Sequence, residues 1–315
     1  MAVRRSVKKT LTPTAQLGIR MHYSNSYIAS YKECPLRCHL TYDIRLEKIE
    51  KGTSEHHLQY GRAMHEALKK IYLGSSLESA VDSFKESYPI QLDETDKAKT
   101  QINGIKCLEE YVKQWSTEDK KWKVISVEEK ETFDYVEDGF TVVLDLVVEN
   151  KEHGGIYGFD HKIVGGKRAT LSLDFWGQFD LNSQITKYYS FIKSKYGDCS
   201  GFYINAIGMR WLERKYKDSP VGLNFRFGRM MYSRNIDQLA IEQADTEYWI
   251  NRIETDKRSN YRGMNTDSCK FCQYREICLA GWRWPTDKEL IEINYQVSEK
   301  ENQNANRSGI SSGQT

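Results

Sequence analysis

The sequence predicts an α/β fold in which helices flank a mixed β-sheet. Amphipathic helical patterns fill the first third of the chain, and three segments rich in β-branched and aromatic residues follow from Trp122 onward. A helix, two further strands and a long helix complete the pattern. Because strands and helices do not alternate regularly, this order favours a mixed sheet between helical layers over a purely parallel sheet.

The helices are predicted from apolar residues that recur three and four positions apart, and from residues that stop helices. The Cys34–Pro35 step ends the first helix, because proline disfavours helical geometry in the residue before it. Gly74 is a typical stop after the second helix. The predicted helices span residues 25–31, 58–73, 77–88, 96–115, 175–195 and 236–254.

The strands are predicted from their β-branched and aromatic content and from the turns between them. The pairs Asp138–Gly139 and Gly154–Gly155 are turn formers that separate the first three strands. The predicted strands span residues 123–135, 140–149, 155–163, 201–209 and 224–232.

Composition limits the possible functions without naming one. A formal net charge of +2 gives no general attraction to nucleic acid, so any DNA-binding surface must be a local one. The sequence contains no apolar run as long as a membrane span, no secretory signal and no Gly-Lys-Ser/Thr phosphate-binding loop. We therefore expect a cytoplasmic protein with no membrane partner and without an ATP motor in this chain.

We expect one domain between two irregular ends. Residues 1–22 contain Arg and Lys but no acidic residue, which indicates a basic flexible arm, and contact of this arm with DNA stays open. Residues 299–315 are rich in Asn, Ser, Gly and Gln and are predicted to be a disordered tail. The domain itself, residues 23–298, divides into a helical part (23–121), a central part (122–256) and a cysteine-bearing segment (257–298).

Two acidic residues and a lysine lie near the ends of two consecutive predicted strands. Asp145 comes late in one apolar strand, and Asp160 and Lys162 end the next one. Residues two apart in a strand share a face, so Asp160 and Lys162 point the same way and His161 points the other way. Carboxylates and a backbone carbonyl are the oxygen ligands that Mg²⁺ or Mn²⁺ prefers. Any single Asp-x-Lys can also be a solvated strand end.

Further polar residues accompany this pair and favour a site over a solvated strand end. His65 lies on a predicted helix upstream. Gln184 and Tyr188 are four apart on the helix that follows, so both lie on one helical face, where an amide and a phenol can contact a phosphate or a base. The same two residues would also fit the polar edge of an amphipathic helix.

Five motifs in this order resemble the RecB-like branch of the PD-(D/E)XK nucleases, which includes CRISPR-associated exonucleases. The motifs are Cys34-Pro35, Gly61-Arg62-Ala63-Met64-His65, Asp145, Asp160-His161-Lys162 and Gln184-Ile185-Thr186-Lys187-Tyr188, and a three-cysteine cluster follows near the end. The resemblance covers about residues 24–281. It implies a restriction-endonuclease-like core, a mixed sheet flanked by helices, with an N-terminal helical part and a C-terminal iron-sulfur segment.

The resemblance also implies roles for individual residues. The metal ligands would be His65, Asp145, Asp160 and the backbone carbonyl of His161. Lys162 would assist the attacking water, and Gln184 and Tyr188 would position DNA. Two positions depart from the family pattern, because Val142 and Ile163 stand where family members often have Gly and Thr. Neither departure removes an expected metal ligand.

The resemblance implies a Mg²⁺- or Mn²⁺-dependent nuclease that acts on single-stranded DNA or DNA ends, in recombination, repair, phage replication or CRISPR-related processing. A separate helicase or other DNA-processing proteins are possible partners. Two alternatives stay open: a catalytically silent DNA-binding or assembly protein that keeps the fold, and a zinc-stabilised structural protein.

The seven cysteines are an odd number, which does not suggest a disulfide framework. Cys269-x2-Cys272-x5-Cys278 is compact, and one more thiolate would complete the four ligands of a 4Fe-4S cluster. The family pattern implies Cys34 as that ligand, with Cys38 as the alternative. Zinc is the competing occupant of a four-cysteine site.

Basic and aromatic residues also gather between positions 210 and 232. Such residues suit a strand of DNA, with cations for phosphates and rings for stacking, and they suit a solvated β-hairpin equally well. They include Trp211, Arg214, Lys215, Tyr216, Lys217, Arg226 and Arg229.

Overall fold

The structure is a computed structural model that describes residues 23–49, 56–89, 97–136, 139–213, 222–256, 261–263 and 266–298. The predicted basic arm (1–22) and the predicted tail (299–315) lie outside the described residues. So does part of the basic and aromatic group, namely Arg214, Lys215, Tyr216 and Lys217.

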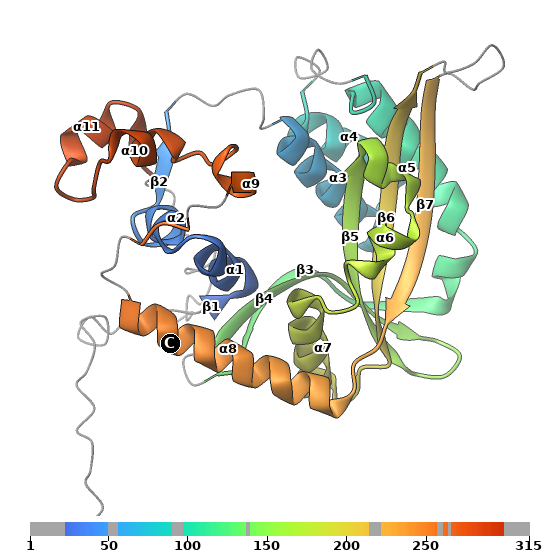
Figure 1. Cartoon of the computed structure of the whole chain (residues 1–315). Helices are drawn as coiled ribbons and strands as arrows, with labels where there is room; N and C mark the ends of the chain where they lie inside the picture. Colours follow the sequence, from blue (N-terminus) through green and yellow to red (C-terminus); the bar gives the residue numbers. More distant parts are fainter. Residues whose placement is uncertain are drawn as a thin grey trace, which may run out of the picture.

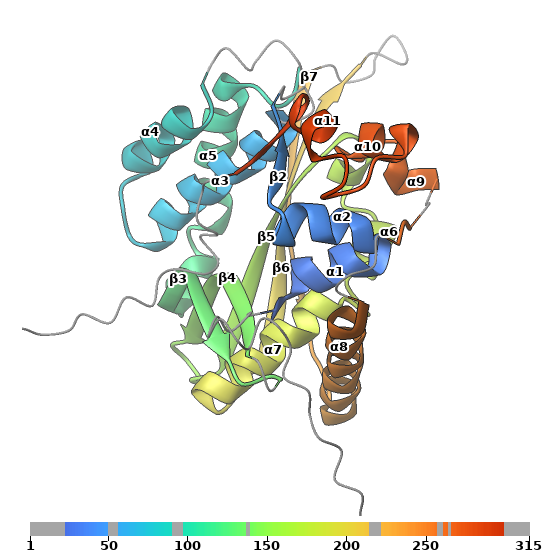
Figure 2. The same ribbon diagram turned by 90° about the vertical axis from the view of Figure 1, so that its left-hand side faces the viewer.

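Within the described residues, a mixed sheet of six strands forms the centre of the fold (Figures 1 and 2). The strands are β1 (Tyr23–Ser24), β3 (Trp122–Phe133), β4 (Phe140–Asn150), β5 (Ile156–Gly165), β6 (Gly201–Leu212) and β7 (Gly222–Tyr232). Strands β3 to β7 lie in chain order, with β5 and β6 parallel and the other pairs among them antiparallel, and β1 pairs parallel with β4. The predicted α/β fold with a mixed sheet is confirmed.

Helices cover both faces of the sheet. The longer ones are α1 (Asn25–Glu33), α3 (His56–Tyr72), α4 (Leu77–Ser87), α5 (Gln101–Trp115), α7 (Ser183–Tyr196) and α8 (Ile236–Asp256), and the short turns are η5 (Glu118–Lys121), η6 (Gly166–Thr170) and α6 (Leu173–Gly177). Alternate residues of β6 join two cores. Ile204 and Phe202 pack with α1 and α7, whereas Ile207 and Met209 pack with α3, α4 and α5.

One predicted helix is divided in the structure, and another begins later than expected. The helix predicted over residues 175–195 is two helices, α6 and α7, because the Asn182 side chain caps a new start by accepting a hydrogen bond from the Ile185 N–H at 3.1 Å. The helix predicted from residue 96 begins at Gln101, because Thr100 caps it in the same way through the Asn103 N–H at 3.2 Å.

A separate small core joins the two ends of the described chain (Figure 1, blue and red). Its elements are α2 (Pro35–Cys38), the π-helical turn η2 (His39–Asp43), β2 (Leu46–Lys48), α9 (Thr266–Cys269), α10 (Arg275–Ala280), α11 (Lys288–Glu292) and β8 (Tyr295–Val297). β2 pairs antiparallel with β8. Leu36 and Leu40 pack there against Tyr274, Ile277 and Tyr295. Among the described helices, none combines the length and apolar character needed to cross a membrane.

Candidate active site

The strands β4 and β5 stop pairing where the predicted acidic residues lie. Their ladder runs from Glu149–Ile156 to Leu146–Phe159, and Asp145 and Asp160 are the next residues on the two strands. The main-chain N–H of His161 donates to Asp145 Oδ2 at 2.5 Å. A side-chain carboxylate thus replaces strand pairing at this point, and both buried acids lie at the separation of the strands.

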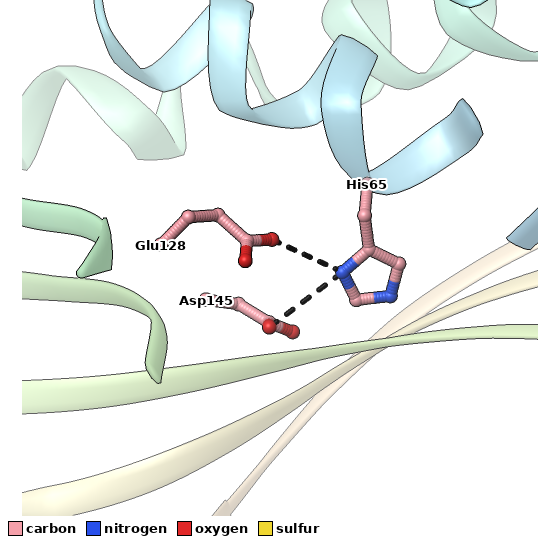
Figure 3. A group of neighbouring side chains, drawn as sticks. All are labelled: His65, Glu128 and Asp145. Atoms are coloured by element: carbon pink, nitrogen blue, oxygen red, sulfur yellow. Dashed lines mark hydrogen bonds and ion pairs between the residues drawn. The ribbon is translucent and has the colours of Figure 1, made fainter. Parts of the chain in front are cut away.

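Three donor side chains converge beside this point (Figure 3). His65 comes from α3, Glu128 from β3 and Asp145 from β4. His65 Nδ1 lies 3.3 Å from Glu128 Oε1 and 3.6 Å from Asp145 Oδ1. The three atoms all lie within 4.8 Å of one another, so one imidazole and two carboxylates form a donor set that suits a divalent cation.

Glu128 is the member of this group that the sequence does not reveal. Its neighbours Val127 and Glu129 pair with Leu146 and Leu144, so Glu128 lies opposite Asp145 in the β3–β4 register. Its φ of 51° is left-handed, a conformation that costs a non-glycine residue free energy and that concentrates at functional sites. Only the hairpin register would have identified this residue.

Charges within the group shift the ionisation of its members. Burial lowers the pKa of His65, but hydrogen bonds and charges of Asp145 and Glu128 outweigh it and raise that pKa to about 10. Burial opposes ionisation of Asp145, yet His65 lowers its pKa overall. The two acids at the strand separation differ, because burial raises the pKa of Asp160 to about 6. The positive charge of His65 thus stabilises the ionised form of Asp145.

Asp160 and Lys162 share one face of β5, as predicted. Asp160 Oδ2 lies 2.6 Å from Lys162 Nζ, yet this buried oxygen makes no well-aligned hydrogen bond within the described residues. Asp160 is not a member of the compact group of three donors. It is a buried carboxylate, paired with Lys162, next to that group.

Gln184 and Tyr188 also share one helical face, as predicted. Gln184 Nε2 donates to Tyr188 Oη at 2.7 Å. Burial raises the pKa of Tyr188, and the negative charges of Asp160, Asp145 and Glu128 raise it further. The phenol on α7 is therefore held neutral and faces the acidic group.

The sequence profile of the PD-(D/E)XK nuclease superfamily matches residues 22–279. The chain belongs to the PD-(D/E)XK nuclease superfamily. No curated protein matches it. The solved structures that match include a crystal structure described as "Putative exonuclease" from Eubacterium rectale, with 15% sequence identity over 83% of this chain and 93% of that chain, and a TM-score of 0.42.

In this PD-(D/E)XK domain, the side chain of His161 points away from Asp160 and Lys162. The ring stacks on Tyr72, with centroids 5.5 Å apart and planes inclined by 14°. Burial lowers the pKa of His161 to about 3, so the imidazole is neutral. The expected ligand role of His161 therefore concerns its main-chain carbonyl alone.

Cys34 lies beside the C-terminal cysteines. Its Sγ caps α2 and accepts a hydrogen bond from the Gly263 N–H at 3.2 Å, across 229 positions of the chain. Cys272 and Cys278 pack against the same small core as Cys34. Burial raises the pKa of Cys272, and the nearby thiols of Cys34 and Cys269 raise it further. The structure thus gathers the four predicted cluster cysteines in one region.

Cys38 lies elsewhere, although it is only one helical turn from Cys34. It is buried in the main core, where its thiol donates to the Tyr27 carbonyl at 3.5 Å, and burial raises its pKa to about 12. Cys107 and Cys199 are buried thiols too, as expected.

One member of the basic and aromatic group is not a candidate for DNA contact. The side chain of Arg229 is 3% exposed and its Nη1 donates to Asp119 Oδ1 at 2.5 Å. Its charge is paired with Asp119 inside the fold. Trp211 and Arg226, by contrast, are exposed.

Proposed function

We propose that this protein is a Mg²⁺- or Mn²⁺-dependent deoxyribonuclease that hydrolyses phosphodiester bonds in single-stranded DNA or at DNA ends. The observation that carries the proposal is the donor group of His65, Glu128 and Asp145, beside Asp160 and Lys162, where β4 and β5 separate. Membership of the PD-(D/E)XK nuclease superfamily supports it. The order of the motifs supports placement in the RecB-like branch.

The chain supplies donors that fit a hard divalent cation. We assign the ligands as His65, Asp145, Asp160 and the main-chain carbonyl of His161, and we add Glu128 to this set. Carboxylate oxygens suit Mg²⁺ and Mn²⁺, and Asp160 adds a buried carboxylate beside the three donors. When bound, the cation supplies charge that polarises the scissile phosphate and lowers the pKa of the attacking water.

The remaining residues act on the substrate directly. Lys162, held 2.6 Å from Asp160, would hydrogen-bond the attacking water and help to remove its proton. The Tyr188 phenol, kept neutral and anchored by Gln184, would donate a hydrogen bond to a phosphate oxygen or a base.

The test is cleavage of end-labelled single-stranded and duplex DNA with Mg²⁺, Mn²⁺ or EDTA. We expect metal-dependent cleavage by the wild-type protein and none by Asp160→Ala. DNA binding without cleavage in either metal would instead identify a catalytically silent DNA-binding or assembly protein. Because no ATP motor is predicted in this chain, unwinding of a duplex would be supplied by a separate helicase.

For the four cysteines we propose a 4Fe-4S cluster with a structural role, held by Cys34, Cys269, Cys272 and Cys278. Its support is the proximity of Cys34 to the C-terminal segment and the burial of Cys38 in another core. Such a cluster would close a loop of more than two hundred residues, which stabilises the fold by restricting the unfolded chain. Anaerobically purified protein should be brown; a colourless preparation containing zinc would reject the cluster.

A further inference from the structure

A network of hydrogen-bonded, buried polar side chains crosses the sheet beside the candidate metal site. Asn205 on β6 lies opposite His161 of β5 in the parallel register and opposite Arg229 of β7 in the antiparallel register. Asn205 is 0% exposed, and His161 and the Arg229 side chain are each 3% exposed. Polar groups at this depth destabilise a fold unless they are hydrogen-bonded, so their partners are structural requirements.

The hydrogen bonds fix the direction of each group. A guanidinium only donates, so the oxygen of the Asn205 amide must face Arg229 Nε, 3.3 Å away. The amide nitrogen is then left for Tyr111 Oη at 2.7 Å and for His161 Nδ1 at 2.8 Å. Because an amide NH₂ only donates, His161 Nδ1 must accept, which selects the neutral tautomer with its proton on Nε2.

Both ends of this side-chain network are held by further contacts. At the far end, Arg229 bonds Asp119 and Tyr72, and its guanidinium carbon lies 4.0 Å from the centre of the Trp115 ring. At the near end, the main chain of His161 donates to Asp145, which in turn contacts His65. Asn205, itself oriented by Arg229 of β7, therefore holds the imidazole of His161. The main-chain N–H of His161 meanwhile holds the Asp145 carboxylate of the donor group.

We propose that Arg229 and Asn205 are positioning residues of the metal site. Arg229 orients the Asn205 amide, the amide selects the tautomer and position of His161, and His161 places the main-chain groups that border Asp145 and Asp160. This inference rests on the proposed metal-dependent function, and it extends the site to residues that lie one strand (Asn205) and two strands (Arg229) beyond β5. Residues that support metal ligands in this way typically change metal affinity by about 10- to 100-fold when replaced.

The direct test is the tautomer of His161, read from ¹⁵N–¹H correlation spectra of histidine-labelled full-length protein without added metal. We expect the Nε2–H tautomer in the wild type. Asn205→Asp keeps an acceptor for Arg229 but removes the donor to Nδ1, so His161 should change to the Nδ1–H tautomer or the imidazolium. Asn150→Asp is the matched control, because Asn150 is also buried and lies outside this side-chain network. Its Oδ1 accepts a hydrogen bond from the Glu152 N–H.

The second readout is Mn²⁺ affinity by titration calorimetry. Asn205→Asp should bind Mn²⁺ about 10- to 100-fold more weakly than the wild type, and Asn150→Asp within twofold of it. The melting temperature of Asn205→Asp without metal, compared with that of Asn150→Asp, separates loss of the metal site from loss of stability, because excess metal also stabilises a weakened fold.

An Nδ1–H tautomer in the wild type, or Mn²⁺ affinity of Asn205→Asp within twofold of the wild type, overturns the proposal. If Asn205→Asp does not fold, the wild-type tautomer decides alone. Neither readout requires DNA cleavage, so loss of the proposed nuclease function and loss of this inference are separate results.

Discussion

Glu128→Gln tests the one member of the donor group that comes from the β3–β4 register. The change removes a negative charge and keeps the side-chain size. Net contributions of hydrogen bonds to charged groups are about 1.5–3 kcal/mol, and about 1.4 kcal/mol corresponds to a factor of ten. Because the Glu128 side chain is 21% exposed, solvent screening favours the lower end. We therefore expect about tenfold weaker Mn²⁺ binding.

The assay is Mn²⁺ titration calorimetry beside cleavage of end-labelled single-stranded DNA. Glu129→Gln is the matched control, because Glu129 is the next residue on β3, carries the same charge and is exposed. In the Glu128→Gln variant, cleavage should approach the wild-type rate once Mn²⁺ is in excess. If Glu128→Gln binds Mn²⁺ as tightly as the wild type, or if Glu129→Gln is weakened equally, Glu128 is not part of the metal site.

Four further outcomes are expected. Because Glu128 has a φ of 51°, Glu128→Gly should be about 1 kcal/mol more stable than Glu128→Ala in urea unfolding, although both lose the carboxylate; equal stabilities would show that the position is not strained. Asp160→Asn should lower Mg²⁺-dependent DNA cleavage by at least about 100-fold without lowering the melting temperature, because burial already disfavours the charged form of Asp160; cleavage at the wild-type rate would remove Asp160 from the site. Cys34→Ala should abolish visible absorption of anaerobically purified protein, whereas Cys38→Ala should keep it; the reverse result would exchange the two ligands. Mn²⁺ affinity should rise about tenfold per pH unit from pH 6 to 8, because a cation must displace the proton that His65 retains up to a pKa of about 10; an affinity independent of pH would show that His65 is not a ligand.

Local sequence patterns were sufficient to predict five of the six strands of the sheet, because β-branched and aromatic content and turn pairs act over a few residues; β1, two residues long, was not predicted. They failed at the helix predicted over residues 175–195. Phe175 and Phe179 continue the apolar spacing into α7, and both are buried, so the spacing does not reveal the break. The Asn182 cap that starts the second helix is a single side-chain hydrogen bond. Asn is common in loops as well as at helix starts, and this position carried no stronger signal.

The candidate site was predictable only where its geometry is local. Asp145 and Asp160 lie on consecutive strands, so their proximity follows from one hairpin. Glu128 required the register of a second hairpin and a left-handed residue within a strand. Arg229 resembled a DNA contact in the sequence, because composition cannot show that a cation is bonded to Asp119, 110 positions away.

The separation of β4 and β5 accounts for the meeting of these distant groups. Past Leu146 and Phe159 the two strands no longer pair by main-chain hydrogen bonds, so the main-chain groups there need other partners. The Asp145 carboxylate accepts a hydrogen bond from the His161 N–H, and it also contacts His65 on α3 of the helical layer. A cation held by donors from α3, β3 and β4 would therefore join the helical layer to the sheet at the point where the sheet lacks its own hydrogen bonds. Metal binding and the local stability of this region would then be one linked equilibrium.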